Sequence, residues 1–359
     1  IFSELDIEKR NALIKYIPDN IQTIIIVILD LCFVTFILGG FMLSRVTDLA
    51  VEVRESFPDD NVEISGVEIK KENTGVSGIT MTLVDIKDEH GKETMGKPVG
   101  KYITLEFSDR EWEKDDEAGL EKVLADIIEK IIMEKIVKKE IVTDKDKSIV
   151  YDNISKAGGE DKTKTENELY IKYKNNKKIM IAGLGNRYAT PDMLGNKVVE
   201  YIDIVPESIC AIAPGVLSQT GMETCDIVKK LVSAGGFDCI VVIDSLCSRH
   251  TERLCHTIQI TDTGISPGAG VGNKRKEIDE NVMGIPVIAI GVPTVVSMAT
   301  VAYDCIEETL LKQGFSQNDI DIFLNQMSNE KYSGLFVTPK DIDEQIFFIG
   351  KAIAGGLNR

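Results

Sequence analysis

The sequence predicts an α/β protein, a three-layer sandwich of helices around a mainly parallel β-sheet. Downstream of residue 177, short apolar runs alternate with segments of helical composition, the clearest of which is 222–234. Apolar runs without alternation are typical of strands that are buried on both faces, as in parallel sheets. Five such runs occur: KIMIAGL (178–184), SICAIAPG (208–215), DCIVVID (238–244), HTIQITD (256–262) and IPVIAIGVP (285–293).

The region upstream of this sandwich predicts a smaller antiparallel addition. Two β-rich runs, ITMTLVDI (79–86) and KYITLEF (101–107), flank a polar stretch that contains glycine, which favours a long hairpin. Apolar residues recur at helical spacing from Leu120 to Ile132 and predict a helix that faces the core. Residues 138–177 are mostly charged and polar, so we expect an insertion or linker without a functional site.

Residues 1–43 differ from the rest of the chain. Their run 24–43 has close to the ~20 apolar residues that span a bilayer, yet Asp30 lies near its middle. A charge at the centre of a membrane costs about 3 kcal/mol. A membrane segment, a buried helix and an extension foreign to the mature protein therefore remain open here, and we assign the folded domain to 44–359.

The charge and the cysteine content limit the classes of function and the cellular locations that we expect. The chain has 41 basic and 58 acidic residues and a net charge of -17. Sequence-independent nucleic-acid binding needs basic surface, so we expect no direct binding of DNA or RNA. The seven cysteines are odd in number and several lie in apolar runs, where thiols pack as small core residues. No disulfide framework is indicated, and a cytoplasmic location is expected.

A glycine-rich loop follows the first apolar run. Gly183 and Gly185 match the start of a dinucleotide-binding motif, but Tyr188 stands near the place of its third glycine. We expect no nucleotide cofactor, and we expect the two glycines to permit a tight turn from strand to helix.

Two further motifs offer weaker signals. The tripeptide DTG (262–264) is also found in the active site of pepsin-like proteases. Those are all-β proteins with the tripeptide or a close variant in each lobe, which does not fit an α/β chain that has it once. Asp262 is therefore expected to line a cleft or order a loop. The stretch CSRHTERLCH (247–256) contains side chains that suit zinc. However, Cys255 and His256 are adjacent, and neighbours on a strand face opposite ways. We therefore expect no metal.

Three acids follow or end predicted strands: Asp192, Asp244 and Asp262. The carboxyl ends of parallel strands meet at one edge of a sheet, where active groups gather. Amide hydrolysis by two carboxylates needs one ionised group to activate water and one protonated group for the carbonyl oxygen and leaving nitrogen. Asp192 and Asp244 are the candidates. The alternative is that Asp192 caps a helix and Asp244 orders a loop.

Long motifs in a fixed order carry a family resemblance. They are GLGNRYATPDMLGNKVVE (183–200), AIAPGVLSQTGMET (211–224), VVIDSLCSRH (241–250), TIQITDTGISPGAGVGNKR (257–275) and GIPVIAIGVPTVV (284–296). Together they resemble the germination proteases of endospore-forming bacteria. SRVTDLAVEVRE (44–55) resembles the segment near the mature N-terminus of that family.

The resemblance implies an endopeptidase that degrades small acid-soluble spore proteins in the spore core during germination. It implies a zymogen with an N-terminal propeptide, a homotetramer, a fold similar to hydrogenase maturation proteases, and an atypical aspartic mechanism without cofactor. The family's two essential aspartates correspond to Asp192 and Asp244. Candidates for lining the cleft are Asp262, Gly264 and Asn186, and candidates for the propeptide boundary are Asp48 and Leu49.

Other functions remain open from the sequence. One is a metal-sensing peptidase like those of hydrogenase maturation, which metal analysis would identify. Another is an inactive relative that is tethered to a membrane through 24–43. A third is a nucleotide-dependent oxidoreductase, which a cofactor titration would identify.

Overall fold

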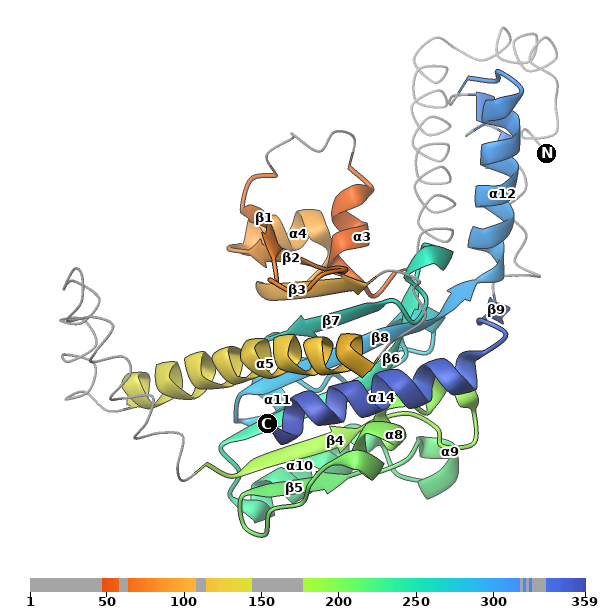
Figure 1. Cartoon of the computed structure of the whole chain (residues 1–359). Helices are drawn as coiled ribbons and strands as arrows, with labels where there is room; N and C mark the ends of the chain where they lie inside the picture. Colours follow the sequence, from red (N-terminus) through yellow and green to blue (C-terminus); the bar gives the residue numbers. More distant parts are fainter. Residues whose placement is uncertain are drawn as a thin grey trace, which may run out of the picture. The chain divides into compact units, whose positions relative to one another are not determined.

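The computed structural model describes most of the chain downstream of residue 46 (Figure 1). The described residues are 47–57, 64–107, 114–143, 177–316, 319–320, 323–324 and 334–359. Contacts divide the chain into two units, one of Ile1–Arg45 with Ala302–Ser333 and one of Val46–Val301 with Gly334–Arg359. The apolar run 24–43 and residues 144–176 of the predicted insertion lie outside the described residues.

The larger unit is built on a mixed nine-stranded sheet in the order β1-β2-β3-β7-β8-β6-β4-β5, with β9 paired to β8. Four neighbouring strands are parallel, namely β5 (Ile209–Ile212), β4 (Ile179–Gly183), β6 (Cys239–Ser248) and β8 (Val287–Ser297). The others pair antiparallel: β1 (Val67–Asn73), β2 (Ile79–Ile86), β3 (Gly100–Phe107), β7 (Thr257–Thr261) and β9 (Phe336–Val337). The α/β class is confirmed, and all five predicted apolar runs form strands.

Strand β7 runs against its neighbour β8. The connection from β6 to β7, residues 249–256, is too short for the crossover of a dozen or more residues that a parallel pair needs. The carboxyl end of β7 therefore lies away from the carboxyl ends of the parallel strands. The expectation that Asp262 meets the other two acids at one edge is wrong for this reason.

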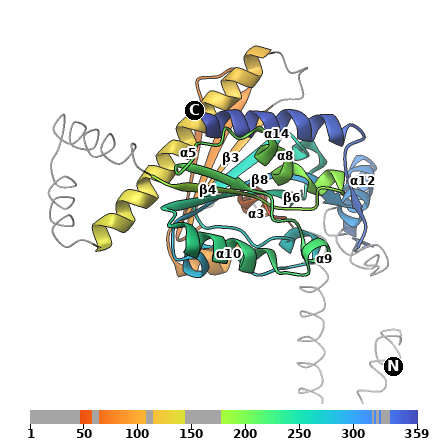
Figure 2. The same ribbon diagram turned by 90° about the horizontal axis from the view of Figure 1, so that it is seen from below.

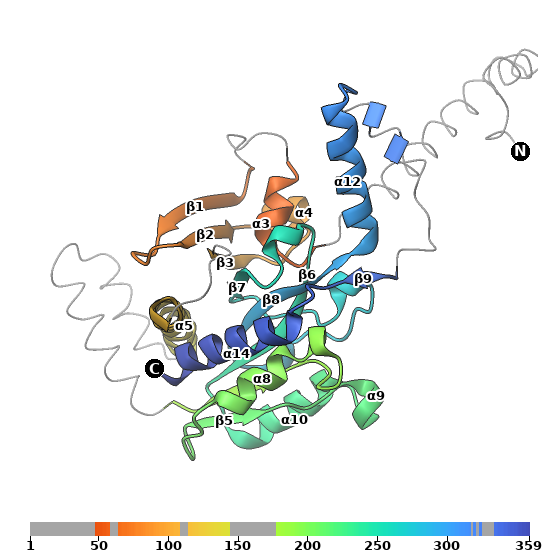
Figure 3. The same ribbon diagram turned by 45° about the vertical axis from the view of Figure 1, so that its right-hand side comes forward.

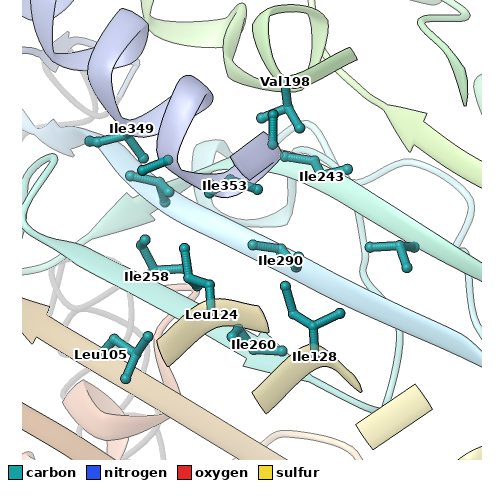
Figure 4. Packing of buried hydrophobic residues seen from close by; sticks show 14 of the residues in the cluster. Leu105, Leu124, Ile128, Val198, Ile243, Ile258, Ile260, Ile290, Ile349 and Ile353 are labelled. Carbon is teal, nitrogen blue, oxygen red and sulfur yellow. The ribbon is translucent and has the colours of Figure 1, made fainter. Parts of the chain in front are cut away.

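Helices cover both faces of the sheet, which makes the predicted three layers (Figure 2). On one face lie α5 (Lys114–Thr143), α8 (Leu194–Tyr201) and α14 (Ile342–Asn358), and on the other lie α10 (Thr224–Gly235) and α11 (Glu280–Met283). The first face is a dense aliphatic core (Figure 4). There, Leu124 and Ile128 of α5 and Ile353 of α14 pack with Ile243 and Ile290 of the sheet. The predicted helices at 120–132 and 222–234 are confirmed.

The N-terminal addition contains the predicted hairpin, since β2 and β3 pair antiparallel. A short helix, α4 (Glu89–Met95), lies in the connection, where the Asp88 carboxylate accepts the N–H of Gly91 at 2.9 Å. Helix α3 (Ala50–Glu55) and α4 pack with β2 and β3 around a small core of their own (Figure 3). The edge strand β1 adds a third strand that the apolar pattern did not predict.

The remaining elements are short or terminal. Two further described helices are α9 (Leu217–Thr220) and α12 (Met298–Lys312). None of the helices in the described part of the chain has both the length and the apolar character needed to cross a bilayer.

Candidate active site

The glycine-rich loop brings α8 against the ends of β4 and β6. A Cβ on Gly195 would lie 2.5 Å from the carbonyl oxygen of Leu184 and 2.6 Å from that of Ile243, and a Cβ on Gly183 would overlap the Gly195 carbonyl. Glycine is needed where backbones approach this closely. The N–H of Leu184 also donates to the Ile243 carbonyl at 2.8 Å. The loop is thus tied to the residue that precedes Asp244, which confirms the predicted tight turn.

Asp192 ends this loop, in the short 3-10 helix η2 (Thr190–Asp192). Its Oδ2 accepts the backbone N–H of Asn186 at 2.9 Å, and no side chain caps α8. The alternative that Asp192 caps the following helix is therefore wrong. Gly185 has a φ of +96°, and a Cβ there would lie 3.0 Å from Asp192 Oδ1. Burial raises the pKa of Asp192, and the N–H of Asn186 opposes that shift.

Two asparagines shape the loop around Asp192. The Oδ1 of Asn186 accepts the N–H of Tyr188 at 3.0 Å and also a hydrogen bond from the Gln219 amide on α9. The Nδ2 of buried Asn196 donates to the Gly185 carbonyl at 3.2 Å. Asn186 therefore orders the carboxylate directly, and its role in lining a cleft stays a prediction. Asn196 was missed in the sequence because a polar residue on a helix gives no sign of what it contacts.

Asp244 lies within β6, opposite Gly291 of β8, with 4% of its surface exposed. The strand continues to Ser248, so the prediction that Asp244 ends it is wrong, because pairing with β8 extends past the acid. Burial raises the pKa of Asp244 well above its usual range, and the negative charge of Asp192 raises it further. The N–H of Ser245 opposes these effects.

The two acids are close enough to interact and differ in environment. Asp192 is half-buried and accepts a backbone hydrogen bond, whereas Asp244 is almost fully buried. Two neighbouring carboxyls have different pKa values, because ionising one of them disfavours ionising the other. Burial and the charge of Asp192 thus both raise the pKa of Asp244, whereas a backbone hydrogen bond from Asn186 opposes the rise for Asp192.

A cavity of about 580 Å³ lies beside β6 and β8. Gly291, the strand partner of Asp244, is in its wall, and so is Leu246. Leu246 and Asp244 project from the same face of β6, since alternate strand residues share a face. Asp262 and Gly264 also line this cavity. Two of the three predicted cleft residues, Asp262 and Gly264, thus line a hollow beside β6 and β8, whose lining does not include Asn186, Asp192 or Asp244.

Asp262 is held within the protein by several groups. Its Oδ1 accepts the backbone N–H of Lys101 on β3 at 2.8 Å, and its Oδ2 lies 3.4 Å from the ammonium of Lys135 on α5. These contacts tie the end of β7 to β3 and α5. Such a carboxylate orders its loop, which is the structural alternative that the sequence left open.

The chain ahead of α3 packs against the end of β6. The Oδ2 of Asp48 accepts the N–H of Cys247 at 2.8 Å, and Oε1 of Glu52 accepts the Ser248 hydroxyl at 2.7 Å. Leu49 has no exposed surface. A propeptide boundary at Asp48 and Leu49 stays a prediction. Their contact with β6 was missed because the partners are nearly 200 residues apart in the chain, beyond any local pattern.

Two thiols of the stretch 247–256 are buried. Burial raises the pKa of both Cys247 and Cys255 to about 12. All six cysteines among the described residues are free, and Cys32 lies outside that part of the chain. In the ranges that the structure describes, no group of His, Cys, Asp and Glu side chains is arranged to hold a metal ion.

The fold and the acids at its parallel strands define an α/β protein of the three-layer class with the groups for acid–base chemistry. A family model described as "Germination protease" matches residues 142–333. Curated relatives agree over most of the chain, and this chain belongs to the germination protease family, a family of proteases.

The relatives span several genera. A germination protease of Caldanaerobacter subterraneus is 37% identical over 87% of this chain and 92% of its own length. One from Clostridium perfringens is 38% identical over 87% of this chain and 93% of its own, and one from Priestia megaterium is 31% identical over 87% and 92%. Among solved structures, a [NiFe] hydrogenase maturation protease from Thermococcus kodakarensis aligns with 52% of this chain and 96% of its own, at 16% identity and a TM-score of 0.31.

Proposed function

We propose that this protein is an endopeptidase that begins the degradation of small acid-soluble spore proteins during germination, with Asp192 and Asp244 as its catalytic acids. Family membership supports a protease that acts at germination. The observation that carries the mechanism is the electrostatic contact between half-buried Asp192 and deeply buried Asp244. A pair with unequal proton affinities contains both an acid and a base at the same pH.

The proposed mechanism divides the work between the two acids. Ionised Asp192 takes a proton from a water molecule, and the oxygen of that water attacks the carbonyl carbon of the scissile bond. Protonated Asp244 donates a hydrogen bond to the carbonyl oxygen and then a proton to the leaving nitrogen. The N–H of Asn186 orients the Asp192 carboxylate throughout.

The cavity beside β6 is the proposed place for a substrate side chain next to the scissile bond. Its volume of about 580 Å³ lies within the range of about 300–1,000 Å³ that is usual for ligand sites. Leu246 and Tyr102 supply apolar wall, and Gly264 and Gly291 leave backbone exposed to a bound chain.

The biological setting is also proposed, on the resemblance of the sequence motifs. The protein works in the cytoplasm of the spore core as a homotetramer and is made as a zymogen. Its net charge of -17 does not suit binding to nucleic acid, so the spore protein itself is the partner that it recognises.

Incubation with a purified small acid-soluble spore protein tests this function. Mass spectrometry should find a few discrete internal cleavages, and an unrelated acidic protein should stay intact under the same conditions. Absence of fragments, or loss of terminal residues alone, would contradict the proposal.

A further inference from the structure

A hydrogen bond from α9 reaches the loop that holds Asp192. The side-chain amide of Gln219 on α9 donates to Oδ1 of Asn186, and the backbone N–H of Asn186 donates to Oδ2 of Asp192 at 2.9 Å. Gln219 and Asn186 are 33 residues apart in the chain. A single loop residue thus joins a separate helix to the acid that is the proposed base.

The orientation of both amides is fixed by backbone N–H groups. Oε1 of Gln219 accepts the N–H of Val216 at 3.3 Å, and Oδ1 of Asn186 accepts the N–H of Tyr188 at 3.0 Å. An amide nitrogen could accept neither of these hydrogen bonds. The NH₂ group of Gln219 therefore faces the side-chain oxygen of Asn186, with a donor on one side and an acceptor on the other.

The backbone turns on both sides of α9. Gly215 and Gly221 flank the helix with φ angles of +76° and +71°, a conformation that glycine adopts without steric cost. A Cβ on Gly215 would lie 2.8 Å from Oε1 of Gln219. The turn at Gly215 therefore leaves room for the Gln219 amide at the place from which it reaches Asn186.

The turn 186–192 is otherwise held by bonds of its own. The N–H of Ala189 donates to the Asn186 carbonyl at 3.0 Å, and the N–H of Asp192 donates to the Ala189 carbonyl at 2.8 Å. Among the described residues, Gln219 is the one side chain from beyond this turn that forms a hydrogen bond with it. The position of the Asn186 N–H is therefore set by the local turn and by Gln219.

The N–H of Asn186 stabilises the ionised form of Asp192. Burial raises the pKa of Asp192, and this N–H opposes the rise. The elements that contact η2 are α8, α14, β6 and β8, and among their described residues Asp244 on β6 is the titratable group that interacts electrostatically with Asp192. A base must be ionised to take a proton from water, so the position of this N–H affects the proposed reaction.

We propose that Gln219 is a positioning residue, which holds the Asn186 N–H against the Asp192 carboxylate and so keeps this carboxylate ionised and oriented for its role as the base. The inference rests on the proposed function of the two acids. Gln219 acts on the reaction through Asn186.

Thr220 provides a matched control on the same helix. Its hydroxyl accepts the N–H of Met222 at 3.1 Å and lies 3.0 Å from the Met222 carbonyl oxygen, to which it donates. Thr220 thus orders the end of α9 and, in the described structure, forms no side-chain hydrogen bond with the turn 186–192. A role in ordering α9 alone would give Thr220→Val and Gln219→Met the same kinetic effect.

The pH profile of kcat/KM on a spore-protein substrate tests the proposal. Gln219→Met nearly keeps the side-chain length but donates no hydrogen bond, so the Asn186 N–H should bond the Asp192 carboxylate less well. The pKa of Asp192 should then rise, and the acid limb should move to higher pH by about 0.5–1 unit while the alkaline limb stays. On the acid limb, we expect about three- to tenfold less kcat/KM for Gln219→Met than for Thr220→Val. An acid limb that matches that of Thr220→Val would overturn the proposal.

A second measurement needs no turnover. In protein with ¹³C-labelled aspartate carboxyls, the Asp192 signal is identified by its loss in Asp192→Asn. The midpoint of its pH titration should be higher in Gln219→Met than in Thr220→Val, and equal midpoints would refute the positioning role. If wild-type protein cleaves no spore protein but the midpoints differ, the proposed function fails while the link from Gln219 to Asp192 stands.

Discussion

Gly195→Ala tests whether the glycine loop sets the positions of the two acids. The added methyl group would lie 2.5 Å from the Leu184 carbonyl oxygen and 2.6 Å from that of Ile243, whereas ordinary contact begins at 3.4 Å. Both neighbours are backbone atoms, so α8 must move away from β4 and β6 by about 1 Å, at an overpacking cost of about 3 kcal/mol. Alanine regains about 1 kcal/mol of helix propensity, which leaves a net loss of about 2 kcal/mol.

This displacement should affect both stability and catalysis. A loss of about 2 kcal/mol lowers the melting temperature by about 4–8 °C in a domain of this size. A misplacement of about 1 Å between reacting groups costs about 10²-fold in rate, so kcat should fall by about that factor. Thermal unfolding and single-substrate kinetics measure both. Gly334→Ala is the control, since nothing lies within 4 Å of its added Cβ. A Gly195→Ala protein that melts and turns over like this control would refute the reasoning.

The remaining predictions concern acidity, reactivity and length. The pKa of Asp244 is raised on folding, so its contribution to stability is lost as the pH rises through the folded pKa. The melting temperature of Asp244→Asn should therefore exceed that of wild type by a margin that grows toward alkaline pH. Plots of melting temperature against pH that stay parallel for the two proteins would contradict this. Iodoacetamide should leave turnover unchanged, because the pKa of the Cys247 thiol is about 12; inactivation together with a mass adduct on that residue would count against it. EDTA should also have no effect, since two carboxylates perform the proposed chemistry; a loss restored by one added metal would point to a metal-dependent peptidase. A chain that begins at Leu49 should be soluble and at least as active as the full chain, because the propeptide boundary is expected at Asp48 and Leu49; an insoluble or inactive shortened protein beside an active full chain would show that the extension is part of the fold.

Most strands of the fold could be predicted because their signal is local. Both faces of β4, β6 and β8 are covered by helices, so each reads as a continuous apolar run. Strand β1 could not be predicted in this way, because VEIKKEN lies at the sheet edge and is largely exposed. The direction of β7 depends on the length of the preceding loop rather than on its own residues.

The candidate acids could be selected from the sequence, but their electrostatics could not. Asp192 follows β4 and Asp244 lies in the neighbouring parallel strand β6, so the sequence could predict that the two acids approach each other, although β6 runs past Asp244 to Ser248. Which acid holds the proton depends on burial and on charges brought from elsewhere, and these belong to tertiary structure. Asp48, for example, contacts Lys97 and Cys247 across the fold, which no spacing along the chain indicates.

The two-acid mechanism is tested most directly by the turnover of Asp192→Asn and Asp244→Asn on a purified small acid-soluble spore protein, with circular dichroism to confirm the fold. Each variant should lose at least about 10³-fold in kcat, since each removes a group that moves a proton in the reaction. Asp262→Asn, whose carboxylate orders a loop, should lose much less. Near wild-type turnover by either Asp192→Asn or Asp244→Asn, in folded protein, would contradict the mechanism.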